Sequence, residues 1–237
     1  MNRISTGIKG LDSMLNGGLI PNRTYVVKGG PGAGKTTLAV QFLLEGAKKG
    51  EQVLYVTLEE PANELIQNMK SFGWNLKEYS NFNIYDVSPS GSEGWQLYSD
   101  HFMRTGTINL KDFYSALDEK LKSIKPKRLV IDPISVVNLF YKDPFELRRD
   151  LISLLKMINS YEITTLLLSE FIKEVQAEEF IVNGVFELRE YEIRGSVIRA
   201  IRIKKMRGTA YDENIRPYKI TDNGLVVYNK ESLSILF

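Results

Sequence analysis

The 237-residue sequence predicts an α/β fold: a mainly parallel, twisted sheet flanked by helices, with antiparallel strands toward the C-terminus. Short apolar runs alternate with longer segments of helical periodicity, which is typical of parallel strands joined by crossover helices. A glycine-rich loop at 29–36 separates one such run from one such segment. Beyond residue 184 extended segments follow one another directly. No linker or internal repeat divides the chain, so one domain over residues 1–237 is expected.

The first half of the chain is expected to supply three strands and two helices. The first helix carries Leu38, Phe42 and Leu43 on one face, and Gly50 fits its C-terminal stop. Pro61 suits the first turn of the second helix. In chain order we expect a strand at 25–27, a helix at 36–49, a strand at 53–58, a helix at 61–72 and a strand at 83–85.

The second half begins with residues 86–109, which show no clear period and are expected to form a long loop or small insertion. Two helices and two apolar strands then alternate, and the three later strands are expected to form an antiparallel edge or hairpin region. In chain order these are a helix at 110–124, a strand at 128–132, a helix at 144–160, and strands at 163–168, 184–188, 196–205 and 216–220.

Composition excludes several kinds of site. There is no cysteine, so disulfides, thiol catalysis and cysteine–zinc sites are excluded. The single histidine, His101, cannot form a two-histidine zinc site, and its polar surroundings favour solvent exposure. No apolar run is long enough to span a membrane, and the start lacks a signal-peptide pattern, so a cytoplasmic location is expected. A net charge of +2 neither requires nor excludes an anionic partner.

The strongest motif is a Walker A phosphate loop, G-x-x-x-x-G-K-[ST], placed between a predicted strand and a predicted helix. Glycines let backbone N–H groups approach phosphates closely, and the helix directs its positive end at the same point. Lys35 is expected to neutralise the β- and γ-phosphates of ATP, and the Thr36 hydroxyl to bind Mg²⁺. The alternative, a turn without a ligand, does not account for the strand–loop–helix context. The residues expected to hold the nucleotide here are Gly29, Gly30, Pro31, Gly32, Ala33, Gly34, Lys35, Thr36 and Thr37.

Three carboxylates are candidates for the metal site and the chemistry. Asp132 ends an apolar strand, as a Walker B aspartate does, and would hold Mg²⁺ through water. Glu59 and Glu60 directly follow the second strand, where a carboxylate can reach the water that attacks the γ-phosphate. From the residues alone, both glutamates could equally be surface acids that open the helix before Pro61.

Several further segments resemble the KaiC-like ATPases of the RecA/RadA superfamily, a group that includes the cyanobacterial clock protein and many archaeal relatives. Their order and spacing cover nearly the whole chain. Besides the Walker A loop they are Ser5-Thr6-Gly7-Ile8, Leu11-Asp12, Gly17-Gly18, Leu58-Glu59-Glu60-Pro61, Ser71-Phe72-Gly73-Trp74, Val130-Ile131-Asp132, Tyr191-Glu192-Ile193-Arg194-Gly195, Lys205-Met206-Arg207-Gly208-Thr209 and Ile220-Thr221-Asp222-Asn223-Gly224.

The resemblance implies a RecA-like core and a homo-oligomeric ring, such as a hexamer, with ATP between subunits. It implies that Glu59 is the catalytic base with Glu60 assisting, and that Ser71 lies near the adenine. Lys205 and Arg207 match cations that reach the γ-phosphate of the neighbouring subunit's ATP.

The resemblance also implies that Thr209 and Tyr211 lie in the same region of contact with the neighbouring subunit. The clock proteins carry histidine at the position of Tyr211. Without the resemblance, the basic residues between 194 and 207 could equally form the solvated face of a strand pair. They are Arg194, Arg199, Arg202, Lys204, Lys205 and Arg207.

The clock protein has two such domains and phosphorylates itself on a Ser–Thr pair, which aligns here with Glu179 and Phe180. Neither side chain has a hydroxyl, so autophosphorylation at that place is excluded, while kinase activity toward another protein stays open. Three purposes are compatible with ATP binding: a slow regulatory ATPase acting on an unknown protein partner, a RadA-paralogue-like protein that binds single-stranded DNA and tunes recombination, and a nucleotide-gated scaffold.

Charge makes DNA the less favoured partner. The stretch 169–184, nearest to a recombinase DNA loop, has a net charge of −3. Residues 86–109 are also net acidic, although Trp95, Tyr98 and Phe102 could stack on bases. A basic cluster could serve DNA or be a solvated helix end; it comprises Lys120, Lys122, Lys125, Lys127 and Arg128.

Overall fold

The computed structural model describes residues 2–91, 110–141, 143–171, 177–193 and 195–231. Within them one mixed sheet runs in the order β3-β2-β4-β5-β1-β6-β7-β8-β9. The six strands from β3 to β6 are parallel, and β7, β8 and β9 continue the sheet antiparallel. The predicted α/β fold, mainly parallel with C-terminal antiparallel strands, is confirmed.

The strand bounds follow the predicted apolar runs closely. In chain order the strands are β1 (Thr24–Gly29), β2 (Val53–Thr57), β3 (Phe82–Asp86), β4 (Arg128–Asp132), β5 (Thr164–Ser169), β6 (Gly184–Ile193), β7 (Ser196–Met206), β8 (Arg216–Thr221) and β9 (Gly224–Val227).

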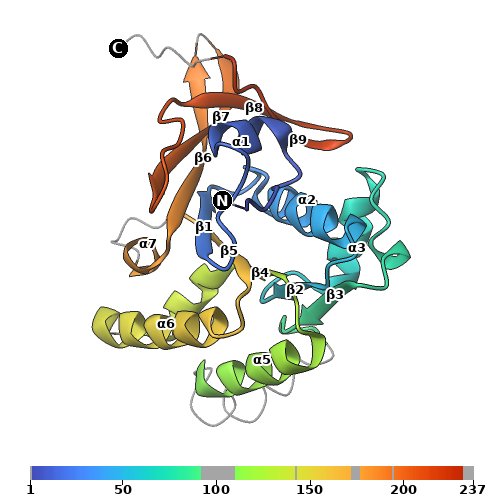
Figure 1. Ribbon diagram of the computed structural model, residues 1–237, viewed down its shortest axis with the longest axis vertical. Coiled ribbons are helices and arrows are strands. Elements are labelled where there is room, and N and C mark those ends of the chain that lie inside the picture. The colour runs from blue at the N-terminus through green and yellow to red at the C-terminus, as the bar shows by residue number, and fades with distance from the viewer. Residues whose placement is uncertain (1, 92–109, 142, 172–176, 194, 232–237) are drawn as a thin grey trace.

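Helices cover both faces of the sheet. Alternation in the strands divides the core: Tyr25 and Val27 of β1 pack on one side, and Val26 packs on the other. The first side is covered by α1 (Lys9–Met14), α2 (Lys35–Lys48) and α3 (Ala62–Lys70), and the second by α5 (Leu110–Ile124) and α6 (Pro144–Asn159). Figure 1 shows α5 and α6 together below the sheet and α2 with α3 at the right.

Shorter helices complete the described chain. They are η1 (Leu76–Glu78), η2 (Ile134–Phe140) and α7 (Ala177–Ile181). The expected loop at 86–109 lies largely outside the described residues, as do His101, Trp95, Tyr98 and Phe102.

One topological expectation is met only in part. The strand expected at 184–188 was grouped with the antiparallel region, and β6 does form an antiparallel hairpin with β7. Its other edge, however, pairs parallel with β1, with Tyr25 opposite Gly184. The helix α7 returns the chain to the starting end of the sheet before β6 begins. Because α7 has only five residues, it carries too little periodicity to reveal a crossover in the sequence.

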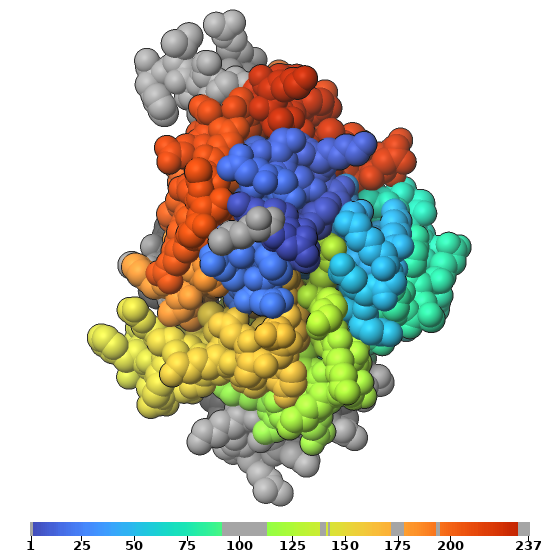
Figure 2. Space-filling view, in the orientation of Figure 1, coloured from blue at the N-terminus to red at the C-terminus, as the bar shows by residue number. Residues whose placement is uncertain are grey.

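The C-terminal strands enclose the N-terminal segment. A Cβ atom on Gly10 of α1 would lie 2.0 Å from the Val227 carbonyl oxygen of β9, so the two backbones meet in close contact. A bridge between Ile4 and Leu19 pairs the start of the chain with the segment that follows α1. Figure 2 shows the blue N-terminal residues seated against the orange and red strands.

Arg128, the first residue of β4, is buried rather than part of a basic surface cluster. Its side chain is 1% exposed. Nε donates to Glu51 Oε2 at 2.5 Å, and Nη1 donates to the carbonyl oxygens of Ser5 and Phe42 at 2.8 Å each. Gly46 makes room for the guanidinium, since a Cβ there would lie 2.4 Å from Nε. The expectation that Arg128 joins the neighbouring surface lysines is therefore wrong.

Candidate functional site

The phosphate loop connects β1 to α2 at the carboxyl end of the parallel strands. Gly34 caps the helix with φ 84°, a left-handed conformation that strongly favours glycine. Lys35 Nζ donates to the carbonyl oxygens of Gly29 at 2.8 Å and Gly30 at 3.0 Å, so the ammonium lies over the loop. The Tyr218 hydroxyl donates to the Ala33 carbonyl oxygen at 2.6 Å and fixes the loop from β8.

The other residues of the motif form the tip of the loop and the first turn of the helix, as predicted. Pro31 and Gly32 are exposed at the tip of the loop. Thr36 and Thr37 lie in the first turn of α2, where Thr37 is 7% exposed and faces the interior. The loop therefore leads directly into the N-terminus of α2, and the start of a helix is a place suited to an anion.

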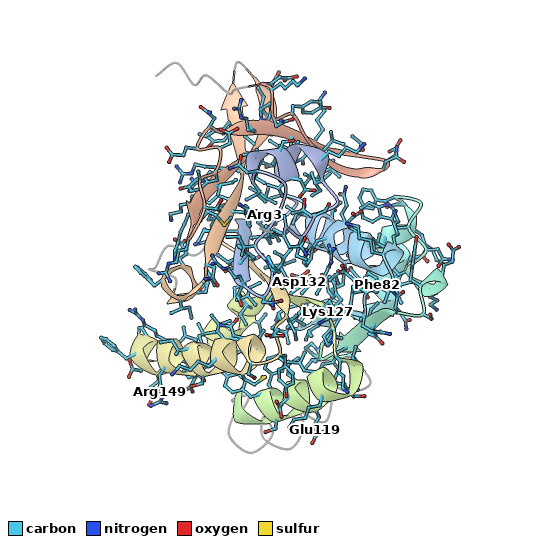
Figure 3. All side chains as sticks on the ribbon, in the orientation of Figure 1. Arg3, Phe82, Glu119, Lys127, Asp132 and Arg149 are labelled. Carbon is cyan, nitrogen blue, oxygen red and sulfur yellow. The ribbon has the colours of Figure 1, made fainter. Side chains whose placement is uncertain are left out.

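Thr36, Asp132 and Tyr55 meet beside this loop. The Thr36 hydroxyl donates to Asp132 Oδ2 at 2.9 Å, and the Tyr55 hydroxyl from the adjacent strand β2 donates to the same oxygen. Burial raises the pKa of the Asp132 carboxyl, and the two hydroxyl donors act in the opposite direction. Figure 3 shows Asp132 near the centre of the molecule, where β4 ends.

The oxygen atoms of Thr36 and Asp132 fit a magnesium ion. Mg²⁺ is commonly held by one or two protein oxygens together with phosphate oxygens and water. Among the described residues no group of three or more His, Cys, Asp and Glu side chains could hold a metal, so a protein-only cage is not found there. When bound beside these two residues, Mg²⁺ would supply charge neutralisation for a phosphoryl group.

Two adjacent glutamates follow β2. The side chain of Glu59 is exposed to solvent, but partial desolvation by the surrounding protein raises its pKa, and the nearby carboxylates of Glu170 and Asp132 raise it further. The carboxylate of Glu60 accepts from Asn68 Nδ2 at 2.7 Å, and burial raises its pKa against that hydrogen bond. The charge of Asp132 acts on both glutamates, but the pKa of Glu59 also responds to Lys35 and Glu170, while Glu60 is hydrogen-bonded to α3.

Burial also lowers the pKa of Lys35, and the carboxylates of Glu170, Asp132 and Glu59 oppose that effect. Glu170 follows β5 and therefore belongs to the same end of the sheet. The site is thus one cation placed among three carboxylates, all positioned by the ends of parallel strands or by the loop after β1.

Lys205 and Arg207 make their contacts with α7. Lys205 Nζ donates to the Glu179 carbonyl oxygen at 2.7 Å, and Arg207 Nη2 donates to the Phe180 carbonyl oxygen at 3.1 Å. Burial lowers the pKa of Lys205, and Arg207 adds to the effect. The two cations therefore form a short arm at the end of β7, held on the last turn of α7.

The remaining predicted residues contact parts of the chain other than the phosphate loop. The Ser71 hydroxyl donates to the Asn68 carbonyl oxygen at 2.7 Å, at the C-terminal end of α3. Thr209 Oγ1 accepts from Arg3 Nη2 at 2.7 Å, and Tyr211 packs partly buried on the chain's own core.

Three residues of the site were not predicted from the sequence. Tyr55 is 1% exposed within an apolar strand and resembles any core tyrosine, while Tyr218 is buried in a C-terminal strand far from the loop in sequence. Glu170 was counted only among the acids of a loop. Its place directly after an apolar strand, like that of Asp132, is the signal that could have identified it.

Comparison with known proteins agrees with this geometry. A family model described as "ATPase: KaiC" matches residues 4–232. The chain belongs to the KaiC ATPase family. The predicted resemblance to KaiC-like proteins is therefore confirmed, and the family membership supports nucleotide binding and ATPase activity at the level of the family.

Relatives of this KaiC-family chain include archaeal and bacterial proteins of similar length. A UPF0273 protein of Pyrococcus horikoshii is 32% identical over 234 residues, covering 95% of this chain and 94% of the relative. The circadian clock oscillator protein KaiC 1 of Synechocystis is 30% identical, and the match covers 96% of this chain but 44% of that protein.

A crystal structure of a KaiC-like protein from Pyrococcus horikoshii superposes with a TM-score of 0.81 at 33% identity, covering 96% of this chain and 99% of that one. The RecA-like arrangement of the core is thus shared with a solved KaiC-like protein. None of the helices within the described residues combines the length and the apolarity needed to cross a membrane.

Proposed function

We propose that residues 1–237 form one ATPase domain that binds ATP with Mg²⁺ and hydrolyses it slowly as a regulatory device. The observation that carries this proposal is the contact of Thr36 with Asp132 at the start of α2, beside the ammonium of Lys35. In this arrangement the loop N–H groups and Lys35 bind the β- and γ-phosphates, and Thr36 and Asp132 hold Mg²⁺ directly or through water.

Hydrolysis requires a group that orients or deprotonates the attacking water. We assign this role to Glu59, because its carboxylate shares the surroundings of Lys35 and Asp132 and its raised pKa suits a base. Glu60 assists from the same turn, where Asn68 restrains its carboxylate.

In this proposal a second copy of the chain supplies the residues that complete the site. We propose that ATP lies between subunits of a ring, and that Lys205 and Arg207 reach the neighbour's γ-phosphate. A cation supplied in trans stabilises the charge that develops in the transition state. For the same ring we assign Ser71 to the vicinity of the adenine, and Thr209 and Tyr211 to the contact between subunits.

The net charge of −3 over residues 169–184 makes a DNA-binding role less favourable. Within this stretch the Glu178 carboxylate accepts from Ser169 Oγ at 2.7 Å, and the Glu179 carboxylate pairs with two lysines, whose charges are thereby engaged within the protein. With Arg128 also buried, the surface loses one cation of the cluster that could have bound phosphates.

The test is ATP hydrolysis by the purified protein, with and without single-stranded DNA, for the wild type, Glu59→Gln and Glu64→Gln. Glu64 is an exposed acid of the first turn of α3 and is the matched control. We expect slow turnover that DNA leaves unchanged and that only Glu59→Gln abolishes. Stimulation by DNA would support the recombination alternative, and ATP binding without turnover would leave a nucleotide-gated scaffold.

A further inference from the structure

The short helix α7 contacts strands from both functional parts of the molecule. Glu178, with 2% of its surface exposed, accepts from Ser169 at the end of β5, next to Glu170. One residue further, the Glu179 carboxylate pairs with Lys28 through Oε1 and with Lys204 through Oε2, the latter at 2.7 Å. Neighbouring acids of one helix turn therefore bind strands β5, β1 and β7.

Lys28 is an unusual residue for its place. It lies on a strand buried along its whole length, directly before the first glycine of the phosphate loop, and it is 4% exposed. A buried ammonium requires a charged partner, because its transfer from water without one is very costly. The partner is Glu179, and Phe171 adds a ring whose centroid lies 5.7 Å from the ammonium.

Glu179 also connects to the arm formed by Lys205 and Arg207. Its carboxylate holds Lys204, the residue directly before the arm, and its backbone carbonyl accepts from Lys205. The next carbonyl, of Phe180, accepts from Arg207. Burial alone would raise the pKa of Glu179, but the hydrogen bonds from Lys204 and Lys28 outweigh it and lower the pKa, so the carboxylate is ionised at neutral pH.

We propose that Glu179 is a positioning residue that fixes the Lys205–Arg207 arm relative to the phosphate loop by tying α7 to Lys28 and to Lys204. The inference rests on the proposed function, in which this arm serves the ATP of the neighbouring subunit. Glu179 acts on its own subunit's arm and thereby on turnover in the next subunit, while its own subunit's phosphate loop keeps its contacts.

Glu179→Gln tests this because the amide keeps the shape of the side chain and removes its charge. Lys28 loses its counter-ion, whereas Lys204 keeps a second carboxylate, Glu187, at 3.4 Å. A displacement of about 1 Å in a group that stabilises the transition state can cost about 100-fold in rate. We therefore expect kcat to fall by about 100-fold while ATP affinity changes by less than about twofold.

The matched control is Glu190→Gln, which removes an acid from the hairpin of β6 and β7, the hairpin that carries the arm. Glu190 pairs with Arg199 at 3.0 Å, and both side chains are about 40% exposed. We expect this variant to keep wild-type kcat. Equal losses in the two variants would overturn the proposal, because a general weakening of the hairpin would then explain both.

Mixing experiments locate the effect. Glu179→Gln subunits keep the phosphate loop, and Lys35→Ala subunits keep a wild-type arm, so mixing the two is expected to recover activity. The reference pair is Lys35→Ala mixed with Arg207→Ala, which must recover activity if the arm acts in trans. If the reference pair stays inactive, the proposed interface fails together with this inference. If only the reference pair recovers, Glu179 acts on its own phosphate loop and this inference alone is wrong.

A second variant keeps the test decisive if Glu179→Gln does not fold. Lys28→Met removes the buried cation, so no charge is left unpaired in the interior, and Glu179 keeps Lys204. We expect the same loss of kcat, recovered by mixing with Lys35→Ala subunits. A folded Lys28→Met protein with wild-type kcat would contradict the proposed link between β1 and the arm.

Discussion

Replacing Tyr55 with phenylalanine tests the proposed magnesium site through a residue that contacts Asp132. Tyr55 lies on β2, is 1% exposed, and its hydroxyl donates to Asp132 Oδ2, the oxygen that also accepts from Thr36. The substitution removes one oxygen atom and leaves the ring packed in the core. Asp132 then keeps its position with one donor fewer.

The magnitude follows from that single hydrogen bond. A hydrogen bond to an ionised group contributes about 1.5–3 kcal/mol. Residues that orient a metal ligand without touching the metal typically change metal affinity by about 10–100-fold when mutated. We expect the Mg²⁺ concentration for half-maximal ATPase activity to rise by about this factor. Since the Tyr55 donor lowers the pKa of Asp132, its loss raises that pKa, and activity is lost at a higher pH as the solution is acidified.

The assay is a magnesium titration of ATP hydrolysis at fixed ATP, repeated at several pH values. The matched control is Tyr25→Phe, another buried tyrosine of the central sheet, whose hydroxyl donates to the Ile20 carbonyl oxygen at 2.8 Å. It should lower stability without changing the magnesium requirement. An unchanged half-saturating Mg²⁺ concentration in Tyr55→Phe, or an equal change in both variants, would refute the assigned role of Asp132.

Three further outcomes are expected. Arg128→Met leaves the partly buried Glu51 without its partner and should lower the free energy of unfolding by about 3–5 kcal/mol, measured by denaturant titration. Glu170→Gln removes a like charge that raises the pKa of Glu59, so the acid limb of the pH profile of kcat/KM should move to lower pH. Gly34→Ala places a side chain at φ 84°, and should cost about 1–2 kcal/mol of stability in the same titration together with weaker ATP binding.

The phosphate loop and the carboxylates were predictable because local sequence determines their place. A strand, a glycine-rich loop and a helix in succession leave one geometry for Lys35 and Thr36, and an acid after an apolar strand falls at the same sheet edge. The structure accordingly brings Asp132 within hydrogen-bond distance of Thr36.

Features that depend on partners distant in sequence were not predictable. Arg128 begins a strand after four residues that include two lysines, a pattern typical of a solvated segment, and only the fold reveals the three groups that surround its guanidinium. Tyr55 has the sequence pattern of a core residue and is indeed buried, and its contact with Asp132 depends on the pairing of β2 with β4 rather than on composition. The parallel pairing of β6 with β1 likewise depends on the position of α7 in the fold. The two residues between α7 and β6 carry no pattern that predicts this pairing.

The place of β1 in the sheet has a consequence for biosynthesis. This strand ends at Gly29, but its two neighbours, β5 and β6, begin only at Thr164 and Gly184. At about 5–20 residues per second, on the order of ten seconds pass on the ribosome before either neighbour exists. During that time β1 lacks both of its neighbours in the sheet, and unpaired strand edges are prone to association with other chains. The loop that would hold the phosphates is therefore among the first segments to be synthesised and among the last to reach its native surroundings.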